Sequence, residues 1–310
     1  MNQNEIYDTI IVGTGVAGYS AAMYAGRLGM KTLVIGEMFG GTITWTNLVE
    51  NYPGIKSISG IELAERLREH AEVYNVKILN DKVIDIQKNN NLFFVKTEFE
   101  QKEYVAKTII LATGTIHRKL DVPGYKELEH KGIHYCALCD AAFYKNKETA
   151  IVGGSDSAVI DALVLSNVCS KVYIIYRGNE LRAEKANLEK LRNAKNIEIL
   201  YNTNVVRVVG EKKVEAVELD KEYRGSKTLK ISGLFIAIGA IPNSELAKKL
   251  NVETNEKGEI KINRKSETNV PGVFAAGDVT DSYFKQAITG IAEAVIAAYS
   301  AFEYIKKHHY

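Results

Sequence analysis

The sequence predicts an α/β protein built from two Rossmann-like, three-layer nucleotide-binding domains, with the second inserted in the first. Two observations lead to this prediction: a glycine-rich turn at residues 13–18 and a similar turn at residues 153–158, each between an apolar run and a helical pattern. In addition, 310 residues are too many for a single core of ordinary size.

The first unit begins with the apolar run 9–12, which is typical of a buried strand. Three glycines follow at the positions of a dinucleotide fingerprint: Gly13, Gly15 and Gly18. An Ala-rich helix and a strand at 31–35 are expected next, and Glu37 stands where a carboxylate accepts hydrogen bonds from ribose hydroxyls. The unit therefore predicts a dinucleotide site with its pyrophosphate at a helix N-terminus.

The second unit repeats this order, with expected strands at 149–152 and 171–176. Its turn carries the candidate phosphate-binding residues Gly153, Gly154, Ser155 and Ser157. The serine at 155 occupies the place of the glycine that approaches pyrophosphate, so its hydroxyl either crowds a phosphate or donates to it. Arg177 replaces the acid of the first unit and Arg182 follows, a pair that favours NADP through its 2′-phosphate. The alternative is two solvated surface arginines.

Each unit ends in a further apolar run with a glycine turn, at 108–114 and 233–239. After Pro242 no third copy begins; a strand is expected at 259–262 and a helix at 286–306. Apolar side chains recur along that helix at helical spacing and predict a stripe facing a core: Ile288, Ile291, Val295, Tyr299, Phe302 and Ile305. This tail is expected to complete the first domain, which makes that domain discontinuous.

Cys136 and Cys139 lie between the two fingerprints and are followed directly by Asp140. Two thiols at this spacing can form and reopen a disulfide, and an adjacent acid can supply the proton that exchange needs. A zinc site that includes His134 and a pair of idle buried thiols are the alternatives, although zinc needs a fourth ligand that the sequence does not offer nearby. The pattern favours redox catalysis with no metal.

Composition excludes several other classes of protein. The net charge of +2 predicts no nucleic-acid partner, and three cysteines are too few for a disulfide scaffold. The polar N-terminus is unlike a signal peptide, and no apolar run approaches the length of about 20 residues that spans a bilayer. We therefore expect a cytoplasmic protein without a membrane partner.

From residue 7 to about 305 the chain closely resembles the low-molecular-weight thioredoxin reductases. The resemblance rests on the order and spacing of short segments at 13–18, 40–41, 49–54, 112–114, 136–140, 153–158, 181–183, 275–278 and 285–289. It implies an FAD domain at 1–116 and 242–310, an inserted NAD(P)H domain at 117–241 that carries the Cys pair, and a homodimer. The positions that match the family's FAD-binding residues are Gly13, Gly15, Gly18, Glu37, Gly41, Thr42, Asn51, Thr113, Gly114, Gly277, Asp278, Gln286 and Ala287.

The same resemblance implies that electrons pass from NADPH through FAD and the Cys136–Cys139 disulfide to a thioredoxin-like or glutaredoxin-like protein. By analogy, Cys139 lies nearer the flavin, Cys136 attacks the protein substrate and Asp140 protonates the departing thiolate. The family reconciles these contacts by rotating the inserted domain about its two linkers.

Three departures from the family pattern leave the electron donor open. Thr42 replaces a glutamine, Ser155 replaces a glycine, and the segment 176–178 lacks one arginine of the usual His-Arg-Arg motif. NADH or a reduced deazaflavin is the alternative donor. Two further alternatives are a ferredoxin–NADP reductase-like flavoenzyme or oxidase in which the thiols are not essential, and a non-enzymatic redox sensor.

Overall fold

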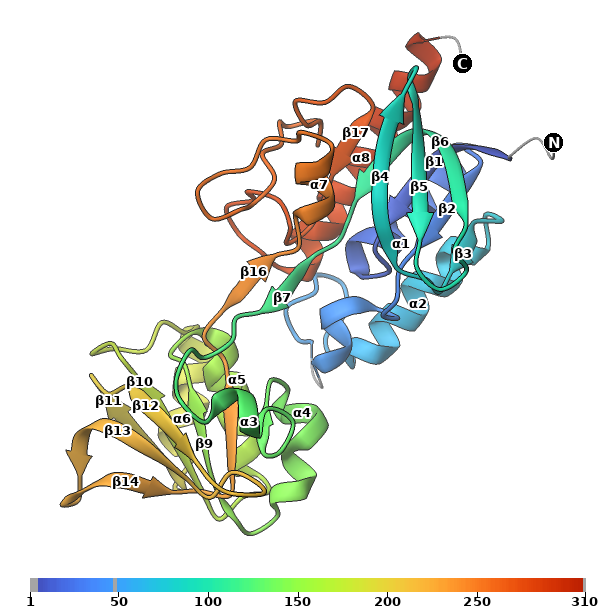
Figure 1. The fold of residues 1–310 in the computed structure, drawn as a ribbon. Coiled ribbons are helices and arrows are strands. Elements are labelled where there is room, and N and C mark those ends of the chain that lie inside the picture. The colour runs from blue at the N-terminus through green and yellow to red at the C-terminus, as the bar shows by residue number, and fades with distance from the viewer. Residues whose placement is uncertain (1–4, 47–48, 309–310) are drawn as a thin grey trace. The chain divides into compact units, whose positions relative to one another are not determined.

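The computed structural model describes residues 5–46 and 49–308, except the side chain of Cys139. The chain divides into two compact units: unit 1 comprises Met1–Ile116 with Ile241–Tyr310, and unit 2 comprises His117–Ala240. Each unit contains its own sheets and its own core (Figure 1).

Unit 1 is built on a seven-stranded sheet in the order β3-β2-β1-β6-β5-β4, with β17 also paired to β6. Its strands are β1 (Ile6–Val12), β2 (Thr32–Ile35), β3 (Lys77–Leu79), β4 (Val83–Asn89), β5 (Leu92–Thr97), β6 (Glu103–Leu111) and β17 (Val273–Ala275). The first half of β6 pairs antiparallel with β5, and its second half pairs parallel with β17. The long, fully apolar end of β6 thus lies between β1 and β17, as a central parallel strand requires.

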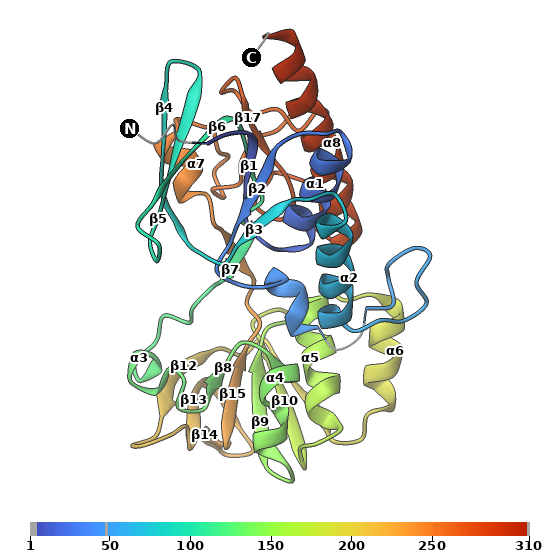
Figure 2. The ribbon, with the colours of Figure 1, turned by 90° about the vertical axis from the view of Figure 1, so that its right-hand side faces the viewer.

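Three helices, α1, α2 and α8, lie on one side of this sheet, and the β4–β5 hairpin lies with α7 on the other side (Figure 2). The helices of unit 1 are α1 (Val16–Arg27), the short 3-10 helix η1 (Gly41–Trp45), α2 (Gly60–Glu72), α7 (Glu245–Lys249) and α8 (Ala287–Lys307). One apolar core joins the sheet to α1 and α8, and a second joins its other face to β4, β5 and α7. The unit therefore has three layers.

The buried face of α8 differs from the predicted stripe. Its fully buried residues are small, namely Gly290, Ala294, Ala297, Ala298 and Ala301, whereas Tyr299 is 51% exposed. The reason is that α8 packs against α1, whose buried residues in the shared core are alanines, so only small residues fit between the two helices. Phe302 and Ile305 pack at the edge of this core, as predicted. In length and composition α8 could cross a bilayer, but its alanine face belongs to the core of unit 1.

The strand predicted at 259–262 is wrong. Ile260 is fully buried, but it makes only isolated bridges, to Thr254 and to Thr280. The side chain of Asn255 accepts the backbone N–H groups of Lys257 and Glu259, which holds a turn where a strand would need to extend. One apolar residue is therefore anchored in the core by a loop.

Unit 2 contains a five-stranded parallel sheet in the order β11-β10-β9-β15-β8 and a three-stranded antiparallel sheet, β12-β13-β14. Its strands are β8 (Ile133–His134), β9 (Glu148–Val152), β10 (Lys171–Tyr176), β11 (Ile197–Tyr201), β12 (Val205–Val209), β13 (Ala216–Tyr223), β14 (Ser226–Lys230) and β15 (Gly233–Ile236). Its helices are α3 (Tyr125–Leu128), α4 (Ala137–Asp140), the 3-10 helix η2 (Ala141–Tyr144), α5 (Asp156–Ser166) and α6 (Lys185–Asn193). Helices α4, α5 and α6 pack against the parallel sheet in one apolar core, and the antiparallel sheet packs against the parallel sheet in a second core. This gives the predicted three layers.

The two connecting segments pair with each other. Strands β7 (Thr115–His117) and β16 (Ala240–Pro242) form a two-stranded sheet. Backbone hydrogen bonds extend the pairing at both ends, from Arg118 N to Gly239 O at 3.0 Å and from Asn243 N to Gly114 O at 2.9 Å. The chain therefore leaves and re-enters unit 1 through one narrow ribbon.

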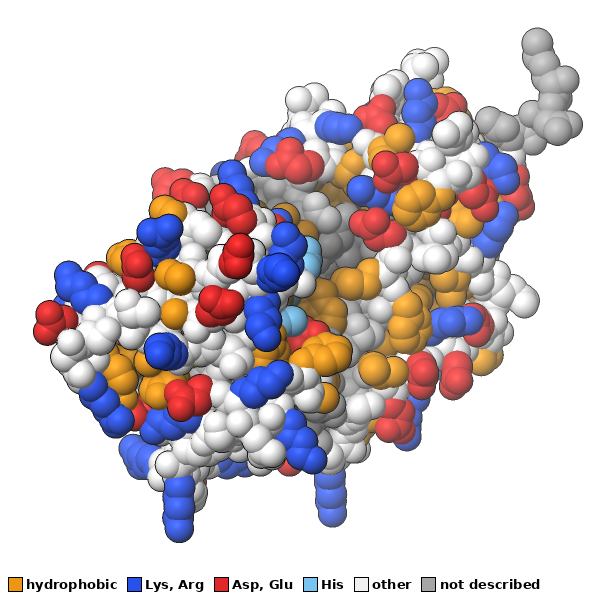
Figure 3. Space-filling model, turned by 60° about the horizontal axis from the view of Figure 1, so that its bottom comes forward, with side chains coloured by type: hydrophobic (Ala, Val, Ile, Leu, Met, Phe, Trp, Pro, Cys, Tyr) orange, Lys and Arg blue, Asp and Glu red, His pale blue; other side chains and the backbone are white. Residues whose placement is uncertain are grey.

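Charged side chains of both signs are interspersed on the molecular face drawn in Figure 3. This distribution agrees with the small net charge of the sequence, +2.

Candidate active site

The first fingerprint forms a tight junction between β1, α1 and the end of β6. Gly13 has a φ of +118°, and a Cβ atom at this position would lie 2.2 Å from the carbonyl oxygen of Ala112. A Cβ atom on Gly18 would lie 1.9 Å from the carbonyl oxygen of Gly13. Only glycine allows these approaches, as the sequence predicts for the turn and for helix–strand packing.

Gly15 differs from its two neighbours because its Cβ direction is open. It precedes α1 with an extended backbone, and the nearest atom that a Cβ would meet is Gly40 O at 3.7 Å. The residues beside it are also glycines. Gly40 forms an isolated parallel β-bridge with Gly15, and a Cβ on Gly41 would lie 3.0 Å from the Gly15 Cα. The surface at the start of α1 is therefore bare backbone, which suits a pyrophosphate.

A second helix begins at the same place. A Cβ on Gly277 would lie 3.0 Å from the Cβ of Ala17 in the first turn of α1, and a Cβ on Gly290 would lie 3.3 Å from the Gly277 Cα in the first turns of α8. The N-terminal ends of α1 and α8 thus lie on either side of Gly277. Because helix N-termini carry partial positive charge and unpaired N–H groups, this pair forms a cradle for an anion.

Other predicted FAD residues lie around this cradle. Asn51 donates a hydrogen bond to Gln286 at 2.9 Å, and Gln286 caps α8, whose first residue is Ala287. Thr42 is exposed in η1, directly after Gly41.

Three predicted positions lie where strands of the sheet end. Thr113 follows β6 and donates through its hydroxyl to Asn243 O at 2.7 Å, and Gly114 comes next. Glu37 is exposed just after β2, and its neighbour Met38 accepts a hydrogen bond from Thr14 in the glycine loop at 2.8 Å. Glu37 therefore lies next to the fingerprint, as the ribose contact requires.

Asp278 follows Gly277 in the cradle. Burial raises the pKa of its carboxyl, and the charge of Lys285 offsets part of that rise. The turn is held by Glu293 on α8, whose carboxylate accepts the N–H of Gly277 at 2.9 Å and the hydroxyl of Thr280 at 3.1 Å. Sequence reasoning missed Glu293; its only signal is that it is the one charged residue in the first half of this helix.

The second fingerprint has the same strand–turn–helix geometry in unit 2. Gly153 has a φ of +150°, and a Cβ there would lie 2.2 Å from Ala237 O. Ser155 and Ser157 are exposed at the start of α5, where they can donate to a phosphate. The arrangement fits a dinucleotide.

The ribose end of this second site departs from the first. The Tyr176 ring lies between two glycines, since a Cβ on Gly154 would lie 2.4 Å from its Cδ2 atom and a Cβ on Gly178 would lie 2.6 Å from its Cε1 atom. Arg182 N donates to Gly154 O at 2.7 Å, so the following loop folds back on the fingerprint. The side chains of Arg177 and Arg182 are exposed.

The Cys pair lies at the short helix α4 of unit 2. Cys136 immediately precedes the helix, is 9% exposed and is disulfide-bonded. The backbone of Cys139 lies in α4, and its side chain lies outside the described part of the structure. Among the described side chains, no group of three or more His, Cys, Asp or Glu residues could hold a metal ion.

Asp140 ends α4 and is paired with His134. The distance from His134 Nδ1 to Asp140 Oδ2 is 2.9 Å, and His134 Nε2 lies 2.7 Å from the Tyr144 hydroxyl. Sequence reasoning considered His134 only as a zinc ligand and missed this contact, although its position in strand β8, six residues before Asp140, was visible.

Asp161 on α5 faces the start of the Cys helix. Its carboxylate accepts a hydrogen bond from the N–H of Ala137, and burial raises the pKa of this carboxyl to about 7. This residue was also not foreseen, because no pattern in the sequence connects α5 to α4.

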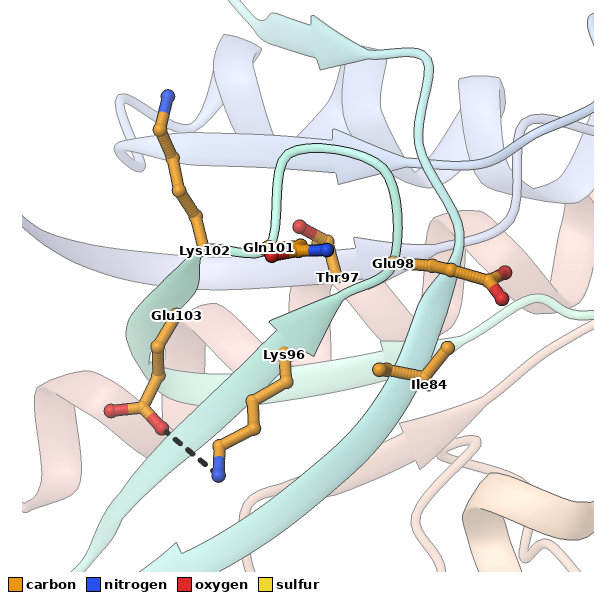
Figure 4. A pocket seen from close by; sticks show the side chains of 7 residues that line it. All are labelled: Ile84, Lys96, Thr97, Glu98, Gln101, Lys102 and Glu103. Atoms are coloured by element: carbon orange, nitrogen blue, oxygen red, sulfur yellow. Dashed lines mark ion pairs between the residues drawn. The ribbon is translucent and has the colours of Figure 1, made fainter.

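A hollow of about 400 Å³ lies elsewhere, beside the β5–β6 turn, lined by Ile84, Lys96, Thr97, Glu98, Gln101, Lys102 and Glu103 (Figure 4). All of these side chains except that of Thr97 are exposed, and Lys96 pairs with Glu103 at 3.9 Å. We assign no ligand to it.

Comparison with known proteins agrees with this geometry. Residues 7–297 match the family described as pyridine nucleotide-disulphide oxidoreductase. The chain belongs to this family. It is 38% identical to the thioredoxin reductase of Bacillus subtilis (strain 168), over 99% of this chain and 97% of that protein. It is also 36% identical to a component of the alkyl hydroperoxide reductase of Staphylococcus aureus (strain MRSA252), over 97% of this chain but only 59% of that protein.

Among solved structures, the thioredoxin reductase of Lactococcus lactis in its FR conformation superposes with a TM-score of 0.92 at 35% identity, covering 97% of this chain and 99% of the other. The expected family and fold class are therefore confirmed. As a pyridine nucleotide-disulphide oxidoreductase with these relatives, the protein is an FAD-dependent enzyme of disulfide chemistry.

Proposed function

We propose that this enzyme is a thioredoxin-disulfide reductase that moves electrons from NADPH, through FAD and the Cys136/Cys139 disulfide, to a thioredoxin-like or glutaredoxin-like protein. The main support is the disulfide-bonded Cys136 at the start of α4, in a chain that matches a thioredoxin reductase along nearly its full length. The ferredoxin–NADP reductase-like alternative is not favoured, because it assigns the thiol pair no role.

In this proposal unit 1 is the FAD domain and unit 2 is the NADPH domain. The bare backbone at Gly15 and Gly41, between the N-termini of α1 and α8, would hold the FAD pyrophosphate, and Glu37 would hold the ribose. Asp278 would accept hydrogen bonds from the ribityl hydroxyls, with Asn51 and Gln286 beside the ring system. The bound FAD supplies two-electron transfer between a nicotinamide and a disulfide.

The Cys pair would carry out the thiol chemistry. Two electrons and two protons convert the Cys136/Cys139 disulfide to a dithiol. The Cys136 thiolate then attacks one sulfur of the substrate disulfide, a mixed disulfide forms, and the departing substrate thiolate takes a proton from Asp140. Attack by Cys139 on Cys136 restores the enzyme disulfide and releases the second substrate thiol.

The decisive test uses the three cysteines of the chain. Cys136→Ser and Cys139→Ser should each retain FAD and lose reduction of oxidised thioredoxin, while the matched control Cys169→Ala, at the buried free cysteine, should keep it. Full thioredoxin turnover by the Cys136→Ser/Cys139→Ser double variant would refute the proposal and would favour the thiol-independent flavoenzyme.

The donor is tested separately by anaerobic titration with NADPH, NADH and a reduced deazaflavin. Arg177 and Arg182 are exposed at the end of the second fingerprint and would bind a 2′-phosphate. Bleaching of the flavin band by NADPH at lower concentration than by NADH would support this assignment; bleaching by the deazaflavin alone would contradict it.

We also propose that the enzyme is a cytoplasmic homodimer. Exposed apolar side chains on α8, Ile296 at 40% and Tyr299 at 51%, support a self-association surface. Light scattering coupled to size-exclusion chromatography should give twice the mass of the 34.4 kDa chain, and the mass of a single chain would contradict the dimer.

A further inference from the structure

Three polar side chains of unit 2 form a chain that leads away from the Cys helix. Asp140 Oδ2 lies 2.9 Å from His134 Nδ1, and His134 Nε2 lies 2.7 Å from the Tyr144 hydroxyl. They come from three consecutive elements: β8, the last residue of α4, and η2. The imidazole thus lies between a carboxylate and a phenol, with both ring nitrogens engaged.

The surroundings hold the imidazole in place. Its ring stacks on Phe235 of β15 with centroids 5.2 Å apart and meets the Tyr144 ring edge-on at 5.4 Å. The His134 side chain is 15% exposed and that of Asp140 is 26% exposed, so both reach water while their pairing geometry is constrained. A ring fixed in this way keeps one nitrogen directed at the carboxylate.

The other titratable groups nearby are few among the described residues. Tyr144 lies on one side, and its pKa is raised to about 12 by burial first and by the charges of Asp140 and Cys169 next, so its hydroxyl keeps its proton at neutral pH. Phe235 adds no charge. On α5, Asp161 faces the opposite end of α4, at Ala137.

An acid that serves disulfide exchange must hold a proton at the pH of the reaction. A free aspartate carboxyl titrates at about pH 4 and a free imidazole at about pH 6.5. An isolated aspartate therefore carries almost no proton at neutral pH. When the carboxylate is paired with an imidazole, the proton on the ring nitrogen lies within hydrogen-bond distance of it.

We propose that His134 is a positioning residue and proton reservoir for Asp140. The inference rests on the proposed function. When the Cys136 thiolate attacks the substrate disulfide, one S–S bond forms and one breaks; the proton on His134 Nδ1 passes to Asp140, and Asp140 transfers it to the leaving sulfur. The imidazole regains a proton from water before the next turnover, so no electrons beyond those of the exchange are needed.

The test separates proton supply from mere positioning through the leaving group. The enzyme is reduced anaerobically with dithionite, which avoids any dependence on the nicotinamide donor, and is mixed rapidly with one of two disulfides. Bis(2-hydroxyethyl) disulfide releases an alkyl thiolate that needs a proton. A nitrobenzoate disulfide releases an aromatic thiolate of low pKa that leaves without one.

The variant His134→Gln keeps an N–H donor for Asp140 but has no titrating proton. We expect it to slow exchange with the alkyl disulfide about tenfold or more at neutral pH, within the range of general acid catalysis, and to change exchange with the aromatic disulfide less than about twofold. Asp140→Asn should show the same contrast, and the double variant should lose no more than either single variant, because the two residues act as one unit.

The matched control is His130→Gln, at an exposed histidine of the same unit, which should behave as the native enzyme with both disulfides. If His134→Gln slowed exchange with both disulfides equally, the proton-reservoir proposal would be wrong, because that pattern indicates only a disturbed structure. A native rate of exchange with the alkyl disulfide would contradict the proposal as well. Oxidised thioredoxin is measured in parallel: if the native reduced enzyme did not reduce it, the proposed function itself would fail, which is a different result.

Discussion

Asn51 donates a hydrogen bond through Nδ2 to Oε1 of Gln286 at 2.9 Å, although the two residues are 235 positions apart in the chain. The same Gln286 side chain caps the first turn of α8. The bond therefore ties the segment after η1 to the helix whose N-terminus forms half of the phosphate cradle.

The first prediction concerns this bond. Asn51→Ala should raise the dissociation constant for FAD about fivefold, because an exposed hydrogen bond of this kind contributes about 1 kcal/mol. Flavin fluorescence on dilution measures the release. Gln87→Ala, which removes an exposed amide bonded to Asp85, is the control and should not change FAD affinity. Unchanged affinity in Asn51→Ala would remove Asn51 from the FAD site.

The second prediction contrasts two glycines of one fingerprint. A Cβ on Gly18 would lie 1.9 Å from Gly13 O, so Gly18→Ala should destabilise unit 1 by a few kcal/mol, as other overpacked sites do. Gly15→Ala meets nothing closer than 3.7 Å, so it should keep the stability of the apoprotein and lose FAD. Denaturant unfolding and bound-flavin absorbance measure the two effects. A flavin-saturated Gly15→Ala protein would contradict the cradle.

The third prediction concerns Asp161, where burial raises the pKa to about 7 from an ordinary value of 3.8. Between these values the folded state binds more protons than the unfolded state, so stability contributed by this group is present at low pH and is lost as the pH rises towards 7. Asp161→Asn, which keeps an acceptor for the Ala137 N–H, should therefore be more stable than the native enzyme at pH 8 and gain little at pH 4.5.

Guanidinium unfolding at both pH values measures this difference, with a scale of about 1.4 kcal/mol per pKa unit. Asp121→Asn, at an exposed aspartate, is the control and should follow the native enzyme. If Asp161→Asn changed the free energy of unfolding equally at the two pH values, burial would not raise the pKa of this carboxyl.

The fourth prediction addresses the donor. Arg177→Ala should raise KM for NADPH about tenfold and leave KM for NADH nearly unchanged, because only NADPH has the 2′-phosphate that a guanidinium can pair with. Arg192→Ala, an exposed arginine on α6, should leave both constants unaltered. The same rise for both nucleotides would mean that Arg177 does not contact that phosphate.

The sequence predicted those parts of the fold that depend on short-range patterns. The β1 and β9 fingerprints, their strands and the three-layer units follow from apolar runs and glycines whose backbone approaches admit no Cβ. The α8 stripe was only partly right, because periodicity identifies a helix but not whether small or large residues face its partner. The strand at 259–262 was wrong, because a single buried isoleucine does not reveal that its flanks turn.

By itself, the sequence determined the family, the two nucleotide-binding units and the segment with Cys136, Cys139 and Asp140. Each of these features depends on residues that are close together in the sequence. Only the tertiary structure decided which distant residues meet: Asn51 with Gln286, Glu293 with Gly277, and Asp161 with the Cys helix. The cause is that such contacts depend on helix packing and on where each chain segment returns, and neither has a period or a spacing in the sequence.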